Sequence, residues 1–521
     1  MTWSSVIQQN KVQAHPNSFR IANKRTGLSV PSSVFTMHNP LAGARHLVKV
    51  KEIAVVKTHA FKKSASLIRS AAKLSVIASA VAMSLTGALA EGTDASHTPS
   101  GAEIAGTASG IPAWTPVGNV GSGWSYGKRR ADFFKYKSDK PLYTIDASNV
   151  DKYADKLNPG QIALLKNLKG FTMPVYPSRR TCGVPDFVAE NTKNNAGFAK
   201  MNADGSELSD AHLPGYPFPA PKTGAEVMWN AKLHYRGAGV EMRDIITVVS
   251  PRKGASDWIK NVSDAWIYQP WGDKAGTTFA KVNQVEGNAY YAYKSPAAIA
   301  GQAAIFTTYA GKPTEVFYYF PGQRRTRRMP SYAYDAPQIG FDNQYNMDEA
   351  LVFSGQTDRF SWKLLGKKEM IVTYNDLGMY DFSDKFEDAY GPDFVNPAKR
   401  RYELHRVWVV EATVKQGMRH TAPKRLFYVD EDSWNYLGAV DYDAQGNISK
   451  VREGYVIPVY ETGSCDTLAF AQYNLVDGRY LVDGSMLAAG RDAKWSVDSS
   501  ADQHYKPSFY NADNLRALSE R

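Results

Sequence analysis

The chain has 521 residues, and its 62 lysines and arginines exceed its 51 aspartates and glutamates, which gives a formal charge of +11. Residues 1–90 contain 12 of the bases and one acid, so the remainder carries 50 charges of each sign. This balance argues against nucleic-acid binding through bulk charge. The length is sufficient for a large core or for two domains, and no apolar stretch after residue 90 approaches the length of a membrane span.

A predicted secretory signal ends near residue 90. Basic residues spread over 57–73 precede the apolar run 74–85, and an Ala-Leu-Ala sequence follows at 88–90. A charged stem, a short apolar core and small residues before the cleavage point are typical of a signal peptide. We therefore expect cleavage after Ala90 and export of the mature protein. The stem is unusually long, so either synthesis starts downstream, at Met37, or the signal carries an extension.

Residues 91–215 are predicted to form an extended arm followed by short helices. Gly, Ser, Ala and Pro dominate 91–130, which show no clear periodicity. Asn158 precedes a proline at the first helical position, which favours a helix reaching residue 168. Further helices are expected at 148–157 and 185–195.

A stiff proline-rich connector at 217–221 leads to another predicted helix. Thr223 and Glu226 have the spacing of a capping box, in which each side chain satisfies an orphan amide of the other residue. The helix that begins there carries four apolar side chains. We expect it to pack on an apolar surface with Val227, Met228, Trp229 and Ala231.

Beyond residue 238 the sequence is rich in β-branched and aromatic segments joined by short turns, which is typical of strands. Tight acidic turns, such as 430–433 and 443–446, imply antiparallel pairing. Strands and helices do not alternate, which disfavours a parallel sheet. The expected strands are 240–250, 266–268, 304–309, 315–320, 324–329, 360–374, 402–415, 424–429, 435–442 and 448–456.

The longest predicted strand places its side chains alternately on two faces. One face is the more apolar, and a broad sheet with one such face needs a cover from helices or from a ligand. The opposite face carries Glu403 and His405, which we interpret as structural hydrogen-bonding residues. The apolar face shows Leu404, Arg406, Trp408, Val410 and Ala412.

Two cysteines, Cys182 and Cys465, lie 283 positions apart. In an oxidising compartment they can form a disulfide that ties the early segment to the C-terminal region. Two buried, unbonded thiols are an equally good interpretation. A metal site built on two cysteines alone is disfavoured.

Candidate catalytic and metal motifs are weak. Residues 123–127 match Gly-x-Ser-x-Gly, but the strand and helix that such a nucleophile requires do not flank Ser125. The acidic run 430–432 lacks the spaced ligands of a calcium loop and is interpreted as a solvated turn. His405, His420 and His504 show no metal-ligand spacing. The sequence therefore predicts no catalytic residue, no metal and no cofactor.

The strongest charge run after residue 90 is 324–328, with four arginines. On a strand, Arg325 and Arg327 point to one side, opposite to Arg324 and Arg328. Two interpretations stay open. The run is a solvated edge that discourages sheet aggregation, or it contacts lipid phosphates or an acidic partner.

Several blocks of sequence, in one order, resemble a known family of exported bacterial proteins, DUF1329. The resemblance covers essentially the whole chain after residue 90, although family members commonly lack a cysteine at position 182. Proteins of this family are likened to the outer-membrane lipoprotein-sorting carriers LolA and LolB. The blocks are 101–103 with 111–114, 173–177, 217–219 with 226 and 229–230, 321–325, 401–413, and 424–434.

The resemblance implies a mainly antiparallel α+β fold, in which helices cover a curved half-barrel sheet in residues 216–521. It also implies a periplasmic, non-enzymatic carrier of a lipid or another amphiphile. A resistance-nodulation-division (RND) type exporter and an outer-membrane protein are the implied partners. Burial of each acyl methylene contributes about 0.8 kcal/mol, so even a modest groove would hold a chain.

Seven residues are expected to line the lipid site, with the arginine as the headgroup contact. Two other functions remain open, namely an adaptor that uses the same fold with a filled interior, and a secreted hydrolase. The expected site residues are Met228, Trp229, Phe317, Tyr319, Arg325, Trp408 and Val410.

Overall fold

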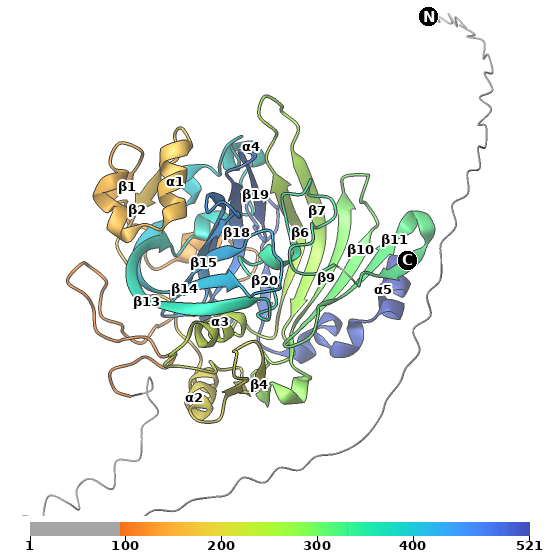
Figure 1. Cartoon of the computed structure of the whole chain (residues 1–521), viewed down its shortest axis with the longest axis horizontal. Coiled ribbons are helices and arrows are strands. Elements are labelled where there is room, and N and C mark those ends of the chain that lie inside the picture. The colour runs from red at the N-terminus through yellow and green to blue at the C-terminus, as the bar shows by residue number, and fades with distance from the viewer. Residues whose placement is uncertain (1–93, 331, 521) are drawn as a thin grey trace, which may run out of the picture. The chain divides into compact units, whose positions relative to one another are not determined.

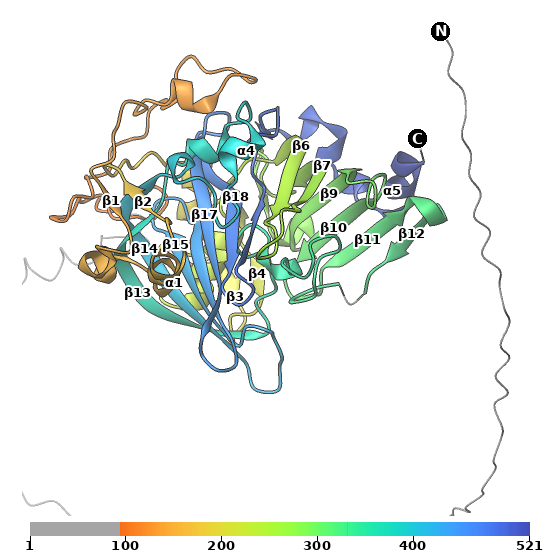
Figure 2. The same cartoon turned by 90° about the horizontal axis from the view of Figure 1, so that it is seen from above.

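A computed structural model describes residues 94–330 and 332–520, which fall within one compact unit. The predicted signal peptide and its cleavage site lie outside the described residues. One open sheet of 16 strands dominates the unit (Figures 1 and 2). Its ladders are antiparallel apart from a single parallel contact between Tyr402 and Val175. The predicted fold class, antiparallel β with helices, is confirmed.

The first half of the sheet follows chain order and ends at an open edge strand. The strands pair with successive neighbours, which is the arrangement that short connections favour. β12 is this edge, and its arginines face largely into solvent. The strands are β6 (Gly239–Val249), β7 (Ile259–Tyr268), β9 (Val285–Ser295), β10 (Ala303–Tyr309), β11 (Glu315–Phe320) and β12 (Arg325–Arg328).

The second half runs back toward the first, and β19 pairs with β6 through Leu481 and Val482. This junction joins the two halves into one curved surface (Figure 2). The strands are β13 (Phe360–Thr373), β14 (Tyr402–Val414), β15 (Lys424–Asp430), β16 (Tyr436–Tyr442), β17 (Ile448–Val459), β18 (Ser464–Asn474) and β19 (Arg479–Asp483).

Short strands extend the sheet or form small hairpins beside it. β20 (Lys494–Ser496) pairs with β6, and β2 (Met173–Val175) joins β1 to β14. The others form two separate two-stranded pairs. Their bounds are β1 (Tyr143–Ile145), β3 (Lys200–Met201), β4 (Leu208–Asp210), β5 (His212–Leu213) and β8 (Thr277–Thr278).

The predicted capping box of Thr223 and Glu226 is present at the start of α3. Asn158 caps α1 as expected, and the structure adds that it forms a capping box with Gln161. The predicted helix at 148–157 is instead a 3₁₀ helix. The α-helices are α1 (Pro159–Asn167), α2 (Asp186–Asn195), α3 (Gly224–Lys232), α4 (Phe386–Ala389) and α5 (Ala512–Ser519). The 3₁₀ helices are Arg130–Phe133, Val150–Lys156, Ala280–Val282, Pro321–Gln323, Met347–Glu349, Leu377–Tyr380, Pro397–Lys399, Ser499–Ala501, Gln503–Tyr505 and Pro507–Phe509.

α3 packs closely on the second half of the sheet. A Cβ atom at Gly224 would lie 2.9 Å from the backbone of Trp362 on β13, so the first turn of the helix requires glycine there. Met228 and Val410 then meet in one apolar cluster that also includes Phe353. The apolar surface expected for this helix is therefore the face of β13 and β14.

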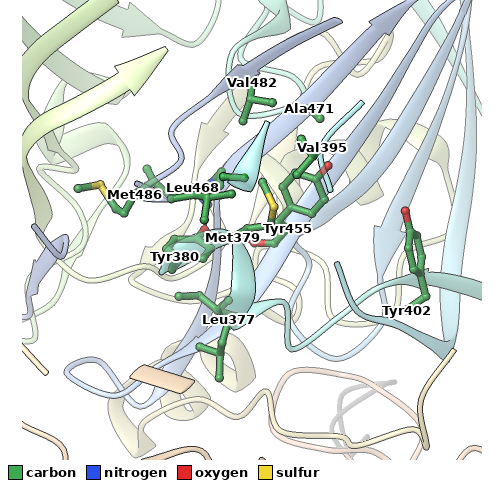
Figure 3. Close-up of a cluster of buried hydrophobic side chains, with 14 of the residues drawn as sticks. Leu377, Met379, Tyr380, Val395, Tyr402, Tyr455, Leu468, Ala471, Val482 and Met486 are labelled. Carbon is green, nitrogen blue, oxygen red and sulfur yellow. Dashed lines mark hydrogen bonds between the residues drawn. The ribbon is translucent and has the colours of Figure 1, made fainter. Parts of the chain in front are cut away.

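The sheet is buried on both faces, not on one as expected. On β14 the side chains of Leu404 and Val410 are buried on one face, and those of His405 and Val409 are buried on the other. The second face is covered because the segment that ends at Cys182 lies over it. Between β13 and β14, an insertion packs side chains onto β17, β18 and β19, as Figure 3 shows for Leu377, Met379, Tyr380, Tyr455, Leu468, Ala471 and Val482.

The structure joins Cys182 to Cys465 on β18, with an Sγ–Sγ distance of 2.03 Å. The sequence left open whether the two cysteines are bonded or are free buried thiols, and the structure has the bonded pair. Together with the contact between β2 and β14, it ties the segment before residue 216 to the sheet. Residues 94–215 consequently pack within the same unit as the rest.

Candidate ligand-binding cavity

A partly enclosed cavity of about 180 Å³ lies where the two halves of the sheet meet. Its floor comes from β6, β7, β9 and β10, and one wall comes from the end of α3 and the residues after it. The segment 333–356, which leads from β12 toward β13, closes much of the remaining side. In this way a curved sheet and one connection create an internal space.

One end of the cavity is polar and carries a buried ion pair. Nζ of Lys232 lies 2.8 Å from a carboxylate oxygen of Glu286. Burial raises the pKa of Glu286, an effect that the Lys232 ammonium opposes. The Lys232 ammonium also donates to the carbonyl of Gly355, at 2.6 Å, which fixes the connecting segment over the ion pair.

His234 and Arg236 continue this polar end. Nδ1 of His234 lies 2.6 Å from the carbonyl oxygen of Ala231 and must donate to it. Nε2 accepts from the guanidinium of Arg236, at 2.6 Å. The imidazole of His234 is therefore neutral, with its proton on Nδ1 and its lone pair on Nε2. This agrees with the pKa of His234, which burial and Arg236 lower. Arg236 in turn pairs with buried Asp466 at 2.9 Å.

The opposite wall is aromatic. Tyr291 and Tyr293 on β9 and Phe306 on β10 lie side by side, with the rings of Tyr291 and Phe306 centred 5.9 Å apart. Burial raises the pKa of both tyrosine hydroxyls, yet the three side chains keep part of their surface accessible. Because protein surrounds them, this accessible surface faces the cavity.

Three buried polar atoms in the lining have no hydrogen-bond partner within residues 94–330 and 332–520. They are the hydroxyl of Tyr436, the side-chain oxygen of Gln269 and Oδ1 of Asp348, whose residues are 3%, 4% and 3% exposed. Buried polar groups in folded proteins are nearly always hydrogen-bonded. These atoms are shielded from solvent, so a molecule bound in the cavity would reach them only after neighbouring side chains move.

The segment 333–356 is anchored to both halves of the sheet. The hydroxyl of Tyr345 donates to Asp483 on β19 at 2.7 Å, and the amide of Gln356 donates to the carbonyl of Tyr309 on β10 at 2.9 Å. Leu351 and Val352 have φ angles of 53° and 69°, which are unfavourable for side chains of their kind. The anchors hold this backbone in a strained conformation.

None of the seven site residues predicted from the sequence belongs to the lining of this cavity. Met228 and Val410 lie in the apolar layer that also contains Phe353 and Phe341 of the cavity wall. Trp229 packs in one cluster with the cavity residue Trp271. These three are thus core residues next to the cavity.

The other four predicted residues lie elsewhere. Phe317 and Tyr319 belong to a cluster with residues of α5, whereas Tyr318 between them contacts the cavity residue Tyr293, with ring centroids 6.3 Å apart. Arg325 is exposed on the edge strand β12. Trp408 stacks on Trp434 with ring centroids 6.1 Å apart.

The serine-nucleophile motif is not placed for catalysis. Ser125 is exposed in a turn, and the nearest helical segment is a 3₁₀ helix that begins at Arg130. A nucleophile elbow needs a strand directly before the serine and a helix directly after it. Residues 123–127 therefore form a surface loop, as the sequence indicated.

Sequence reasoning missed the polar end of the cavity because Lys232, His234 and Arg236 follow the predicted helix without matching a known motif. The position of these three residues could have indicated a site, because they place basic or polar side chains between an apolar helix and a strand. Such a junction favours a site at the rim of a sheet. Glu286 was missed together with the strand β9 that carries it.

An open, curved antiparallel sheet with a few helices, lined at one place by a cavity with a polar end and an aromatic wall, defines the class as α+β. The chain belongs to the family DUF1329, described as a protein of unknown function, whose sequence profile matches residues 144–516. It is 33% identical over 461 residues to the uncharacterised protein PA3922 of Pseudomonas aeruginosa, covering 85% of this chain and 97% of that protein. The predicted family resemblance is confirmed.

Solved structures also resemble the chain, at low identity. An outer membrane lipoprotein-sorting protein domain from Vibrio parahaemolyticus has a TM-score of 0.38 at 12% identity, covering 57% of this chain and 98% of that one. A DUF1329 family protein from Desulfovibrio piger has a TM-score of 0.37 at 12% identity, covering 55% and 98%. The LolA superfamily protein NE2245 from Nitrosomonas europaea has a TM-score of 0.32 at 12% identity, covering 56% and 99%. Within residues 94–330 and 332–520, no helix combines the length and apolar character that a membrane crossing needs.

Proposed function

We propose that this protein is a non-enzymatic periplasmic carrier that binds a lipid or another amphiphile between the two halves of its sheet. The observation that supports this most is the cavity, which has an aromatic wall, a charged end and three buried polar atoms without a hydrogen-bond partner among the described residues. Its polar groups suit a headgroup, and its rings suit an apolar body. We place the bound headgroup near Lys232 and Gln269.

The volume limits what can enter. An engineered cavity of about 150 Å³ admits benzene, so about 180 Å³ holds a ring or a short piece of alkyl chain. Pockets for larger ligands usually measure roughly 300–1,000 Å³. A long tail would therefore extend through the open side, or the segment 333–356 would move outward to enlarge the space.

Cavity filling tests the carrier. Ala289 lines the cavity on β9, and Ala289→Trp would place an indole there, which is larger than benzene. We expect binding of the fluorescent hydrophobe N-phenylnaphthylamine to weaken at least tenfold, and lipid that co-purifies without detergent to disappear from mass spectra. Ala298→Trp introduces the same side chain at an exposed position and should leave both readouts unchanged.

The second candidate is an adaptor that acts through its surface. It is favoured by the exposed arginines of the open edge strand β12, which suit an acidic partner. If wild-type protein carries no lipid and binds no probe, while pull-down from envelope membranes recovers a partner, the adaptor replaces the carrier. Under either proposal the protein would work with an RND-type exporter and an outer-membrane protein. The same pull-down tests for these partners. An esterase screen with Ser125→Ala as its control addresses the hydrolase.

A further inference from the structure

A buried cluster of potential metal ligands lies on the second half of the sheet, outside the set of cavity-lining residues. One ligand atom each from His405, Asp430 and Asp432 lies within 4.8 Å of the other two. The three residues are 1%, 1% and 4% exposed. The expectation of a solvated turn at 430–432 is therefore wrong, because Arg180 of the N-terminal segment lies over it and pairs with Asp432 at 2.6 Å.

The acids around this cluster each have a cation. Arg401 pairs with Glu403 at 2.6 Å, and Arg406 pairs with Glu431 at 2.5 Å. With Arg180 on Asp432, the neighbouring carboxylates are compensated. Burial of a charge without such a partner is costly.

Asp430 is the exception. Within residues 94–330 and 332–520 no basic side chain lies within ion-pair distance of its carboxylate. Its Oδ2 accepts from the hydroxyls of Tyr374 at 3.0 Å and of Ser433 at 2.5 Å. Its Oδ1 is buried and has no hydrogen-bond partner among the same residues. A fully buried carboxylate oxygen is thus available beside an imidazole and a second carboxylate.

The imidazole of His405 is oriented as a metal ligand usually is. Its Nε2 lies 3.1 Å from Oε2 of Glu403, and Glu403 accepts further bonds from Arg401 and Asn375. Because Glu403 acts as an acceptor, Nε2 carries the proton and Nδ1 keeps a lone pair. The ring of Tyr374 stacks on His405 with centroids 3.6 Å apart, which fixes the ring plane. A carboxylate behind a histidine is the common outer arrangement of metal sites.

We propose that Nδ1 of His405, Oδ1 of Asp430 and a carboxylate oxygen of Asp432 bind a divalent first-row transition metal, with zinc as the best match. One nitrogen and two oxygens, with water as a fourth ligand, suit tetrahedral zinc. Calcium and magnesium prefer sites made of oxygens alone. Zinc bonds of 2.0–2.2 Å place tetrahedral ligand atoms roughly 3.3–3.6 Å apart, so small side-chain rotations would close the site.

The metal's role is structural. It joins β14 to the turn between β15 and β16, beneath the N-terminal segment. Because the ligands come from separate strands, metal affinity stabilises the folded state by mass action. The Asp432 carboxylate can serve Arg180 and the metal together, since each of its oxygens has two lone pairs.

The test is the metal content of the whole exported protein, purified without chelators from cells grown with added zinc. We expect about one metal ion per chain by plasma mass spectrometry. His405→Gln and Asp430→Asn should each lower this at least tenfold. His420→Gln is the matched control, because His420 is another buried histidine, 2.9 Å from Asp348, and this variant should keep the metal.

A second measurement does not depend on the variants folding. Dialysis of wild-type protein against EDTA should lower its melting temperature, and added zinc should restore it. Cobalt added instead should give the visible absorption of a tetrahedral complex. Wild-type protein that holds no metal and whose melting temperature ignores zinc would overturn the proposal, as would metal that persists in both ligand variants.

Discussion

Replacing Tyr436 by phenylalanine removes a buried hydroxyl that has no partner among the described residues and lines the cavity. An unsatisfied buried polar group costs about 1–3 kcal/mol. The hydroxyl oxygen is shielded from solvent, so water does not offset this cost. We therefore expect Tyr436→Phe to raise the free energy of unfolding of lipid-stripped protein by about 1–3 kcal/mol. Urea denaturation followed by tryptophan fluorescence measures this change.

Tyr402→Phe is the matched control, because its hydroxyl lies 2.8 Å from Glu453 and 2.9 Å from Arg400 in the core. Loss of hydrogen bonds to charged groups should lower the free energy of unfolding by about 2–3 kcal/mol. The same chemical change thus has opposite signs at the two tyrosines. A loss of more than about 1 kcal/mol at Tyr436 would show that its hydroxyl is already satisfied in the empty protein, and would refute the reasoning.

If the Tyr436 hydroxyl contacts cargo, Tyr436→Phe should also weaken binding of a hydrogen-bonding amphiphile by about fivefold to tenfold, which corresponds to one hydrogen bond. Binding of N-phenylnaphthylamine, which carries one N–H group, can be compared with binding of a dansylated fatty acid. Equal affinities of wild type and variant for both probes, while Ala289→Trp abolishes binding, would remove Tyr436 from the contact surface.

Two further changes test the framework around the cavity. Cys465→Ser removes the disulfide to Cys182, which closes a long loop of the chain. We expect the free energy of unfolding, measured by urea denaturation, to fall by about 2–5 kcal/mol. A denaturation midpoint equal to that of the wild type would contradict this. Asp348→Asn leaves Arg425, whose Nη1 lies 2.5 Å from Asp348, with one carboxylate fewer, and should cost about 3–5 kcal/mol. Burial disfavours ionisation of Asp348, but Arg425 and His420 outweigh it and hold the pKa below its ordinary value of 3.8. This contribution is present above about pH 4 and is lost as the pH falls, so acid unfolding of Asp348→Asn should show a shallower pH dependence than wild type.

Local chemistry allowed much of the fold to be predicted. The cap and following proline at Asn158 and the capping box at Thr223 depend on residues at most three positions apart, and both helices begin where expected. Strands rich in aromatic and β-branched residues were also located closely, as with β11. The strands β9 and β18 were missed because residues of low strand propensity, such as Gly287, Ala289 and Ala469, interrupt their aromatic and β-branched positions.

The candidate site could not be predicted in the same way, because its faces depend on what covers each strand. The bounds of β11 were correct, but α5 occupies the side of Phe317 and Tyr319, which leaves Tyr318 on the side of the cavity residue Tyr293. An error of one residue exchanges the two faces of a strand. Likewise, the sequence of 430–432 is typical of a solvated turn, but in the structure Arg180, some 250 positions earlier, covers it.

The segment 333–356 connects the cavity to the rest of the fold and bears on how cargo would exchange. It is hydrogen-bonded to the first half of the sheet through Asn261 and to the second half through Gln472. The left-handed backbone at Leu351 and Val352 opposes the closed conformation, so these contacts, not local backbone preference, hold it there. The segment is also held by the ion pairs of buried Asp348 with Arg425 and of buried Glu349 with Lys450, and by burial of Val352 and Phe353 in the core. Outward movement of the whole segment would break these contacts, so cargo that enters without such a cost would have to use the open side of the cavity.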